Sequence, residues 1–262
     1  MIFRRFLQRF RQQQWGAIAT ELAIVIIGVF IGMQVSNWNQ DRADARLGRD
    51  YVQRLIRDLD EDQAAVRAQR NYYADVLKSV QSTDQLLRAA DADPRTLVVN
   101  AYRATEVTYI PPVHATWDQI VSSGHLGLLP AGAVESGLSQ YYAFDTARDT
   151  YRLGMDSSYR QTVRKIIPLP MQIAMRAGCS DVRDKRGNIV GFAKECRVDA
   201  DPATLKGVAA ALRSTPAVAA DLRYQYSFAA SAVANLGGVG STIADALTAL
   251  GAGPKAVKKV SP

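Results

Sequence analysis

The chain has 262 residues, with 32 Lys and Arg against 25 Asp and Glu, a formal net charge of +7 and two cysteines. A chain of this length can bury a substantial core without needing many disulfides or a structural metal ion. A basic balance can indicate nucleic-acid binding, but here the positive charges are interspersed with acidic residues rather than gathered in a patch. We therefore expect no nucleic-acid partner.

The most informative segment is the apolar stretch Trp15–Val35, which contains no Lys or Arg and one acidic residue, Glu21. At about 1.5 Å per residue a helix of this length covers roughly 31 Å, which matches a hydrocarbon core about 30 Å thick. The sequence therefore predicts a single transmembrane anchor over residues 15–36, with membrane lipid as a partner.

The charges on the two flanks predict how this anchor is oriented. Residues 1–14 carry four arginines and no acidic residue, whereas acidic and basic residues alternate after the anchor. By the positive-inside rule, residues 1–14 are a cytoplasmic segment of a bacterial inner-membrane protein, and the bulk of the chain is periplasmic. The alternative is a cleaved signal peptide. Its candidate cleavage site, Ala43-Asp44-Ala45, lies beyond a charged stretch, which favours an uncleaved anchor.

The two cysteines, Cys179 and Cys196, agree with export. Between them Asp184–Asn188 has turn composition and separates two short β-capable runs, so a hairpin over 178–198 brings the sulfurs together. In an oxidising compartment they are expected to form a disulfide. Two unpaired buried thiols are the alternative, and the spacing excludes a CxxC redox or zinc motif.

The exported domain, predicted over 37–252, has helical periodicity. From Val52 to Leu87 an apolar or aromatic residue returns every seven positions, and the helix is expected to end at Asp91–Pro94. Companion positions Asp62, Gln69 and Thr83 are polar. This composition disfavours a two-stranded coiled coil and favours packing against other helices of the same chain.

A second stripe over 134–166 predicts another long helix, which stops before Pro168. The remaining helix signals are a capping box at Thr116–Gln119 with Gly124 as terminator, helix starts at Asp201-Pro202 and Thr215-Pro216, and a break at Gly237-Gly238. Strand alternation is limited to the hairpin and to a possible strand at Leu97–Val107. The predicted fold is mainly α: a single N-terminal transmembrane helix followed by an antiparallel helical bundle with a small disulfide-closed hairpin insertion.

Two features near the C-terminus leave alternatives open. Ser227–Gly251 has one charge, Asp245, so a second membrane span is conceivable. Its Ala, Gly, Ser and Thr content disfavours insertion. Residues 253–262 are expected to form a disordered basic tail.

One face of the anchor is small and polar. Glu21, Val25, Gly28, Gly32 and Val35 fall close to one line on a helical wheel, and Gly28-x-x-x-Gly32 allows close helix approach. We expect this face to pack against a transmembrane helix of a second copy or of another membrane protein. Chance occurrence of the glycine spacing, and snorkelling of Glu21 to the interface, are the alternatives.

Aromatic and amide residues at the ends of the anchor are expected to lie at the membrane interface. They are Trp15 at its start and Asn37, Trp38 and Asn39 at its end, where the last three are also predicted to cap the helix exit.

Several of these residues resemble a known pattern. Glu21, Gly28 and Gln34-x-x-Asn37-Trp38-Asn39 are similar to the anchor motif of a widespread family of uncharacterised bacterial single-pass membrane proteins, a domain of unknown function. Thr116–Gly124 and Leu138–Tyr142 resemble that family's central elements. The chain departs from the family at Thr20, at Ser36 and in its cysteine hairpin. The resemblance implies an anchored, mostly helical exported domain and brings no catalytic residues.

Catalytic patterns are sparse. His114 and His125 lack metal-ligand spacing and flank a short helix, where surface or capping positions are expected. Gly237–Thr242 lacks the lysine of a phosphate loop, and the acidic run Asp58–Asp62 is expected to be a solvated helix face. We therefore expect no catalytic, cofactor or metal site.

The sequence favours a non-enzymatic, membrane-anchored interaction or accessory subunit of an envelope complex. The alternative is an exported ligand-sensing bundle. Such receptors usually have a second span and a cytoplasmic output domain, whereas only 14 residues are expected inside here. An enzyme of unknown type is a second alternative.

Overall fold

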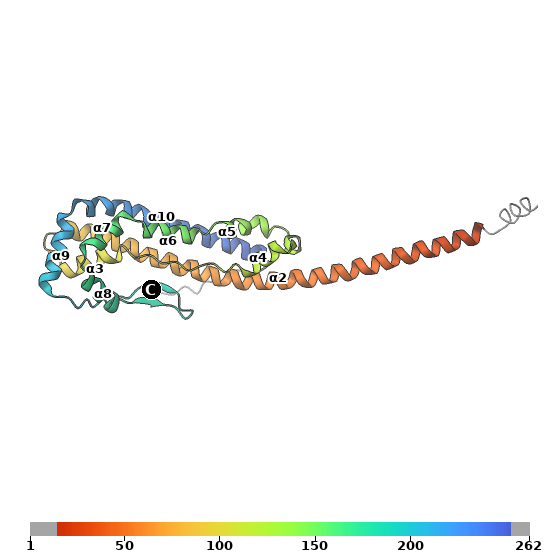
Figure 1. Cartoon of the computed structure of the whole chain (residues 1–262), viewed down its shortest axis with the longest axis horizontal. Coiled ribbons are helices and arrows are strands. Elements are labelled where there is room, and N and C mark those ends of the chain that lie inside the picture. Colours follow the sequence, from red (N-terminus) through yellow and green to blue (C-terminus); the bar gives the residue numbers. More distant parts are fainter. Residues whose placement is uncertain (1–14, 253–262) are drawn as a thin grey trace, which may run out of the picture. The chain divides into compact units, whose positions relative to one another are not determined.

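The computed structural model describes residues 15–252 (Figure 1). The expected cytoplasmic segment 1–14 and tail 253–262 lie outside the described residues. The chain divides into two compact units at Asp50/Tyr51. The helices and strands are α2 (Trp15–Arg88), α3 (Pro94–Arg103), α4 (Ala115–Ser122), η1 (His125–Leu128), η2 (Val134–Leu138), α5 (Ser139–Ala143), α6 (Thr146–Met155), α7 (Ser158–Ile166), α8 (Leu169–Gly178), β1 (Asp181–Arg183), β2 (Ile189–Phe192), α9 (Pro202–Ser214) and α10 (Pro216–Ala249).

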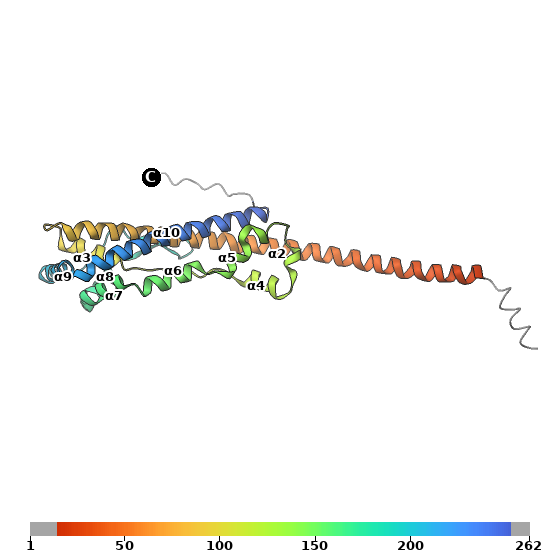
Figure 2. The ribbon, with the colours of Figure 1, turned by 90° about the horizontal axis from the view of Figure 1, so that it is seen from above.

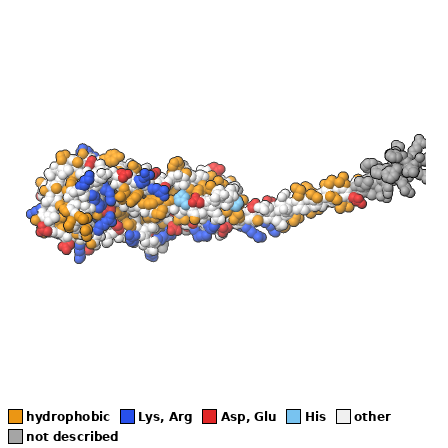
Figure 3. All heavy atoms as spheres, in the orientation of Figure 1, with side chains coloured by type: hydrophobic (Ala, Val, Ile, Leu, Met, Phe, Trp, Pro, Cys, Tyr) orange, Lys and Arg blue, Asp and Glu red, His pale blue; other side chains and the backbone are white. Residues whose placement is uncertain are grey.

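Residues 19–35 of α2, which lie in the first unit, are mostly apolar and are exposed. One helix among the described residues, Ala19–Arg88, contains a stretch long and apolar enough to cross a membrane. The ten large apolar side chains between Leu22 and Val35 are 51–63% exposed. Figure 3 shows hydrophobic side chains over this part of the helix. Such a surface needs a cover other than water, either lipid or another apolar helix.

Helix α2 does not end at Asn37–Asn39, so the predicted helix-exit cap is wrong. The helix runs without interruption to Arg88. The residues after Asn39 are mostly helix-compatible, with no Pro and no Gly before Gly48, and the amide of Gln40 donates to Asp44 one turn later at 2.8 Å. Arg88 is followed by the predicted stop, where Asp93 caps the next helix, α3. The guanidinium of Arg213 donates to the Ala89 carbonyl at 3.2 Å, which satisfies a backbone acceptor beyond the helix end.

The second unit is an antiparallel helical bundle. Figures 1 and 2 show α10 beside the part of α2 that lies in this unit, and Tyr73 of α2 meets Phe228 of α10 edge-on, with ring centroids 6.0 Å apart. Helix α10 also contacts η2, α5, α6 and α7, and α3 packs on α9. The largest fully buried side chains are Tyr51, Tyr73, Tyr159, Leu55, Leu59, Leu97, Ile120, Leu138, Ile167, Met175, Leu212 and Leu236.

The second apolar stripe does not form one long helix. The structure divides residues 134–166 into the π-helical turn η2 and the helices α5, α6 and α7. Asp145 accepts a hydrogen bond from the backbone N–H of Arg148 at 2.9 Å and so caps α6, and Ser157 caps α7. These capping side chains offer the backbone an N-terminus in the middle of the stripe, which the apolar periodicity alone does not reveal.

Two other local predictions are wrong. Leu97–Val107 is not a strand, because residues 94–103 form α3 behind the Asp93-Pro94 start. The glycines at 237 and 238 do not break α10, which is one helix from Pro216 to Ala249. Leu236 and Ile243, on either side of the glycines, are fully buried. The burial of these two side chains stabilises the helix by more than the roughly 1 kcal/mol by which each glycine disfavours it relative to alanine.

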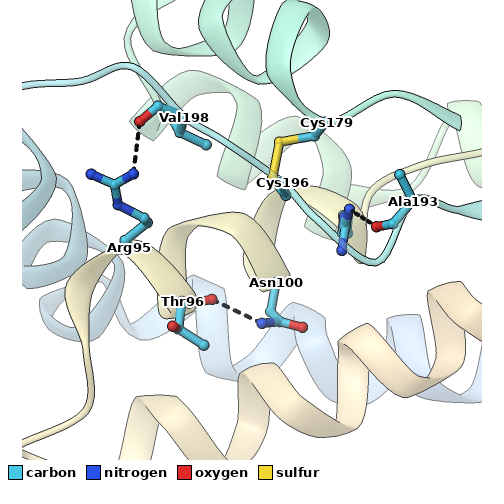
Figure 4. Close-up of a disulfide and its surroundings, with 8 residues drawn as sticks. Arg95, Thr96, Asn100, Cys179, Ala193, Cys196 and Val198 are labelled. Carbon is cyan, nitrogen blue, oxygen red and sulfur yellow. Dashed lines mark hydrogen bonds between the residues drawn. A yellow bond between two sulfur atoms is a disulfide. The ribbon is translucent and has the colours of Figure 1, made fainter.

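The cysteine hairpin forms as predicted. Strands β1 and β2 pair antiparallel, with Val182 opposite Gly191, and the Asp184 carboxylate accepts backbone hydrogen bonds within the turn. Cys179 and Cys196 are joined by a disulfide (Figure 4).

The chain after the hairpin is tied to α3 by two arginines. The Arg95 side chain donates to the Val198 carbonyl at 3.0 Å, and Arg103 donates to Ala193 at 2.7 Å (Figure 4). The disulfide therefore closes a segment that is also fixed to the bundle.

Candidate functional site

A row of polar side chains on α2 faces the interior of the bundle. Asp62, Gln69 and Thr83 are 0–1% exposed, and two of them hold the extended segment 105–114. Gln69 Oε1 accepts the N–H of Ile110 at 3.0 Å, and Asp62 Oδ1 accepts the N–H of Val113 at 2.9 Å. The prediction that these positions pack within the chain is confirmed. The prediction of a solvated acidic face is wrong for Asp62, because this segment covers it.

Asp62 is the one acidic residue of this row, and its pKa is shifted. Burial raises its pKa from 3.8 to about 6, and the neighbouring Asp58 carboxylate adds to the rise. The Val113 N–H, the Tyr141 hydroxyl and His114 act in the opposite direction. The Tyr141 hydroxyl lies close enough to Asp62 to lower its pKa by hydrogen bonding, although Oδ2 of Asp62 makes no hydrogen bond of good geometry. Burial therefore dominates, because the surrounding protein keeps bulk water away from the charged carboxylate.

Two further buried oxygens near Asp62 lack hydrogen-bond partners. They are Oδ2 of Asp58, one helical turn earlier on α2, and the hydroxyl of Tyr142 on α5. Burial raises the pKa of Tyr142, and the charges of Asp62 and Asp58 raise it further. Asp58, Asp62 and Tyr142 thus form an electrostatically coupled cluster with three unpartnered oxygens.

The rings of His114, Trp117 and Tyr141 pack on Tyr142, the aromatic member of this cluster. Trp117 of α4 stacks on Tyr142 with ring centroids 4.9 Å apart and planes 10° apart, and His114 meets Tyr142 edge-on at 5.3 Å. Tyr141 also lies against Tyr142, at 4.9 Å. The pKa of Tyr141 is raised by burial and by the charge of Asp62. We call these four residues the aromatic cover: His114, Trp117, Tyr141 and Tyr142.

Helix α4 starts two residues earlier than the predicted capping box, whose N-cap would be Thr116. Its N-cap is His114, whose side chain makes no capping hydrogen bond, and Thr116 lies inside the helix and is buried. The prediction that Gly124 ends this helix is confirmed, since the helix stops at Ser122 and Gly124 adopts a left-handed φ of 70°.

A small cavity of about 20 Å³ adjoins Asp62. The polar residues that line it are Asp62, Gln69, Tyr141, Asp145 and Thr146, and its other lining residues are apolar. A space of this size exceeds the roughly 10–15 Å³ that one water molecule requires. It is too small for an organic ligand.

The two histidines occupy separate places. His114 belongs to the aromatic cover, whereas Nδ1 of His125 lies 2.9 Å from the hydroxyl of buried Tyr51. Within residues 15–252 no group of three His, Cys, Asp or Glu side chains is arranged to hold a metal ion.

The predicted helix-packing face lies on the first part of α2. Glu21, Val25, Gly28, Gly32 and Val35 are all exposed, and an added Cβ at either glycine would meet no atom within 4 Å.

Of the predicted interface residues, Asn37, Trp38 and Asn39 are exposed on α2. The guanidinium of Arg42 lies 4.0 Å from the Trp38 ring centroid. The side chain of Trp15 lies outside the described set.

Sequence reasoning missed Asp62 as a site residue. Its signal was present, because Asp62 and Gln69 occupy one heptad row beside the apolar stripe. The structure stacks Trp117, from the segment 116–124, on Tyr142, whose pKa is affected by the charge of Asp62. Comparisons of the chain with family models, curated proteins and solved structures found no match.

Proposed function

We propose that the chain is a single-pass inner-membrane protein whose bundle lies in the periplasm and serves as a non-enzymatic interaction subunit of an envelope complex. The observation that carries this proposal is the exposed apolar surface of α2 between Leu22 and Val35. An apolar helix of this length is stable when lipid or partner helices surround it.

The glycine face of the anchor supports a role beyond attachment. Gly28 and Gly32 leave the helix backbone open on one side, on the same line as Glu21. Small residues at this spacing let a partner helix approach closely, and an intramembrane acid is stabilised by a polar partner. The disulfide supports an oxidising location for the bundle.

The location is tested with C-terminal fusions. An alkaline phosphatase fusion should be active and a green fluorescent protein fusion dark, because phosphatase folds in the periplasm and the fluorescent protein in the cytoplasm. The reverse pattern would refute the proposed topology.

The interaction role is tested by crosslinking in membranes. Replacing both Gly28 and Gly32 by Ile keeps the anchor hydrophobic but blocks close approach, so the oligomer or partner band should weaken while insertion persists. Ala23→Ile, on the opposite side at about 160° from Glu21 on a helical wheel, is the matched control. If both variants leave the band unchanged, the anchor face is a lipid contact only.

A further inference from the structure

The Asp62 cluster is not explained by the proposed interaction role. Asp62 is 1% exposed, and its Oδ2 has no partner although Oδ1 is bound by the Val113 N–H. A buried, ionised carboxylate with one unsatisfied oxygen is costly, whereas a neutral carboxyl is not charged and gains an O–H donor. The Asp58 carboxylate and the Tyr142 hydroxyl, which interact electrostatically with Asp62, also have oxygens without hydrogen-bond partners.

We propose that Asp62 is a proton-binding site, and that proton uptake tightens the contact of α2 with segment 105–114 and with the aromatic cover. The ligand is a proton rather than a metal ion, because the cluster offers two carboxylates and tyrosine hydroxyls, and no metal-holding group of three occurs within residues 15–252. The adjoining cavity is also small, at about 20 Å³.

The groups that face Asp62 come from every element packed around it. Asp58 lies on α2 itself, His114 precedes α4, and Tyr141 and Tyr142 lie on α5. Asp118 and Asp145 act on the two tyrosines. Asp145 is already engaged, since it accepts the Tyr109 hydroxyl and pairs with Arg148. His114 also faces Asp62, and its positive charge, when it is present, lowers the pKa of Asp62 and so opposes proton uptake.

The mechanism is a local one. With Asp62 ionised, opening of the aromatic cover lets bulk water solvate the charged carboxylate, so open states are populated more at neutral pH. With Asp62 protonated, the carboxyl is neutral and opening brings no gain in solvation free energy, so the aromatic cover stays closed. The chain would therefore become more rigid around residues 105–143 as the surroundings acidify. This behaviour does not depend on the anchor or on its partner.

Hydrogen exchange measured by mass spectrometry on the full chain in detergent tests this inference. Exchange times at pH 5.0 and pH 7.5 are scaled for the intrinsic exchange rate. Peptides within 105–143 should show roughly tenfold or greater protection at pH 5.0, since one unit of pKa corresponds to a tenfold change in population. Peptides from α9, remote from the cluster, should not change. Equal protection of 105–143 at both pH values in the unaltered protein would overturn the proposal.

Variants identify the responsible group. Asp62→Asn should give high protection at both pH values, because the amide is neutral and can donate. His114→Gln should retain the pH dependence, which matters because histidine ordinarily titrates near about 6.5. Exposed Asp149→Asn is a control that should behave as the unaltered protein. Loss of the pH dependence in His114→Gln, or its persistence in Asp62→Asn, would assign the effect to another group and refute the inference.

Discussion

The carboxylate of Asp62 accepts the backbone N–H of Val113, 51 residues later in the chain, at a distance of 2.9 Å. The bond fixes an extended segment against α2 and removes Asp62 from water. Its consequences for stability depend on pH.

Asp62 should make the bundle less stable as pH rises. Its pKa is about 6 in the folded protein against an ordinary 3.8, so the folded state binds the proton more tightly than the unfolded state. The contribution of Asp62 to the free energy of unfolding is therefore greatest below pH 4. As the pH rises through about 6, the free energy of unfolding falls by up to about 3 kcal/mol.

Asp62→Asn should remove this loss. The variant should unfold at a higher temperature than the unaltered protein at pH 7.5 and at a similar temperature at pH 4.5, measured by circular dichroism in detergent. A variant less stable than the unaltered protein at pH 7.5 would show that the ionised carboxylate is favourable.

Gln69→Leu should destabilise the second unit. The Gln69 amide accepts from Ile110 N–H at 3.0 Å and points its own N–H to the Ile110 carbonyl at 3.5 Å. Leucine leaves these backbone groups unpaired, at a cost of about 1–3 kcal/mol. Gln53→Leu, on an exposed position of the same helix, should cost much less, and urea denaturation compares the two. Equal effects would mean that the Gln69 hydrogen bonds contribute nothing specific.

Gly178→Ala should be harmful because the chain passes close to this residue. An added Cβ would overlap the carbonyl oxygen of Arg197, the residue that follows the disulfide-bonded Cys196. Relieving the overlap requires backbone movement, which typically costs about 1–3 kcal/mol and lowers the unfolding temperature by a few degrees.

Gly207→Ala is the matched control. Gly207 lies within α9 with no atom within 4 Å of an added Cβ, so alanine should stabilise the helix by about 0.5–1 kcal/mol. Thermal unfolding of both variants decides the matter. The unfolding temperature should fall for Gly178→Ala and rise for Gly207→Ala. An unchanged unfolding temperature in Gly178→Ala would show that the backbone around Arg197 is free to move.

Reduction of the disulfide should expose two reactive thiols and weaken the hairpin. Protein prepared without reductant should not react with maleimide until it is reduced, because Cys179 and Cys196 are joined. Replacing both by Ser should cost roughly 2–5 kcal/mol. The two arginine bonds to Ala193 and Val198 should keep the segment near α3 in the variant. Alkylation of both thiols in the unreduced, folded protein would contradict the disulfide.

Local features of the sequence determined much of this architecture. Asp93 and Asp201 cap helices whose first residue is proline, and Asp184 organises the hairpin turn. Each of these signals acts over a few residues, so its meaning does not depend on the rest of the fold. The apolar composition of residues 15–35 likewise suffices to identify a candidate span.

Only the tertiary structure decided the features that depend on distant partners. Helix α10 continues through Gly237-Gly238 because Leu236 and Ile243 are buried against other elements. Within the stripe over 134–166, the capping residues Asp145 and Ser157 also bond the distant side chains of Tyr109 and Gln225. Asp62 looked like a member of a solvated acidic run. It is buried because a segment 51 residues away covers it and donates a hydrogen bond to it. Burial sets the proton affinity of a carboxyl, and a sequence does not state which distant backbone will exclude water from it.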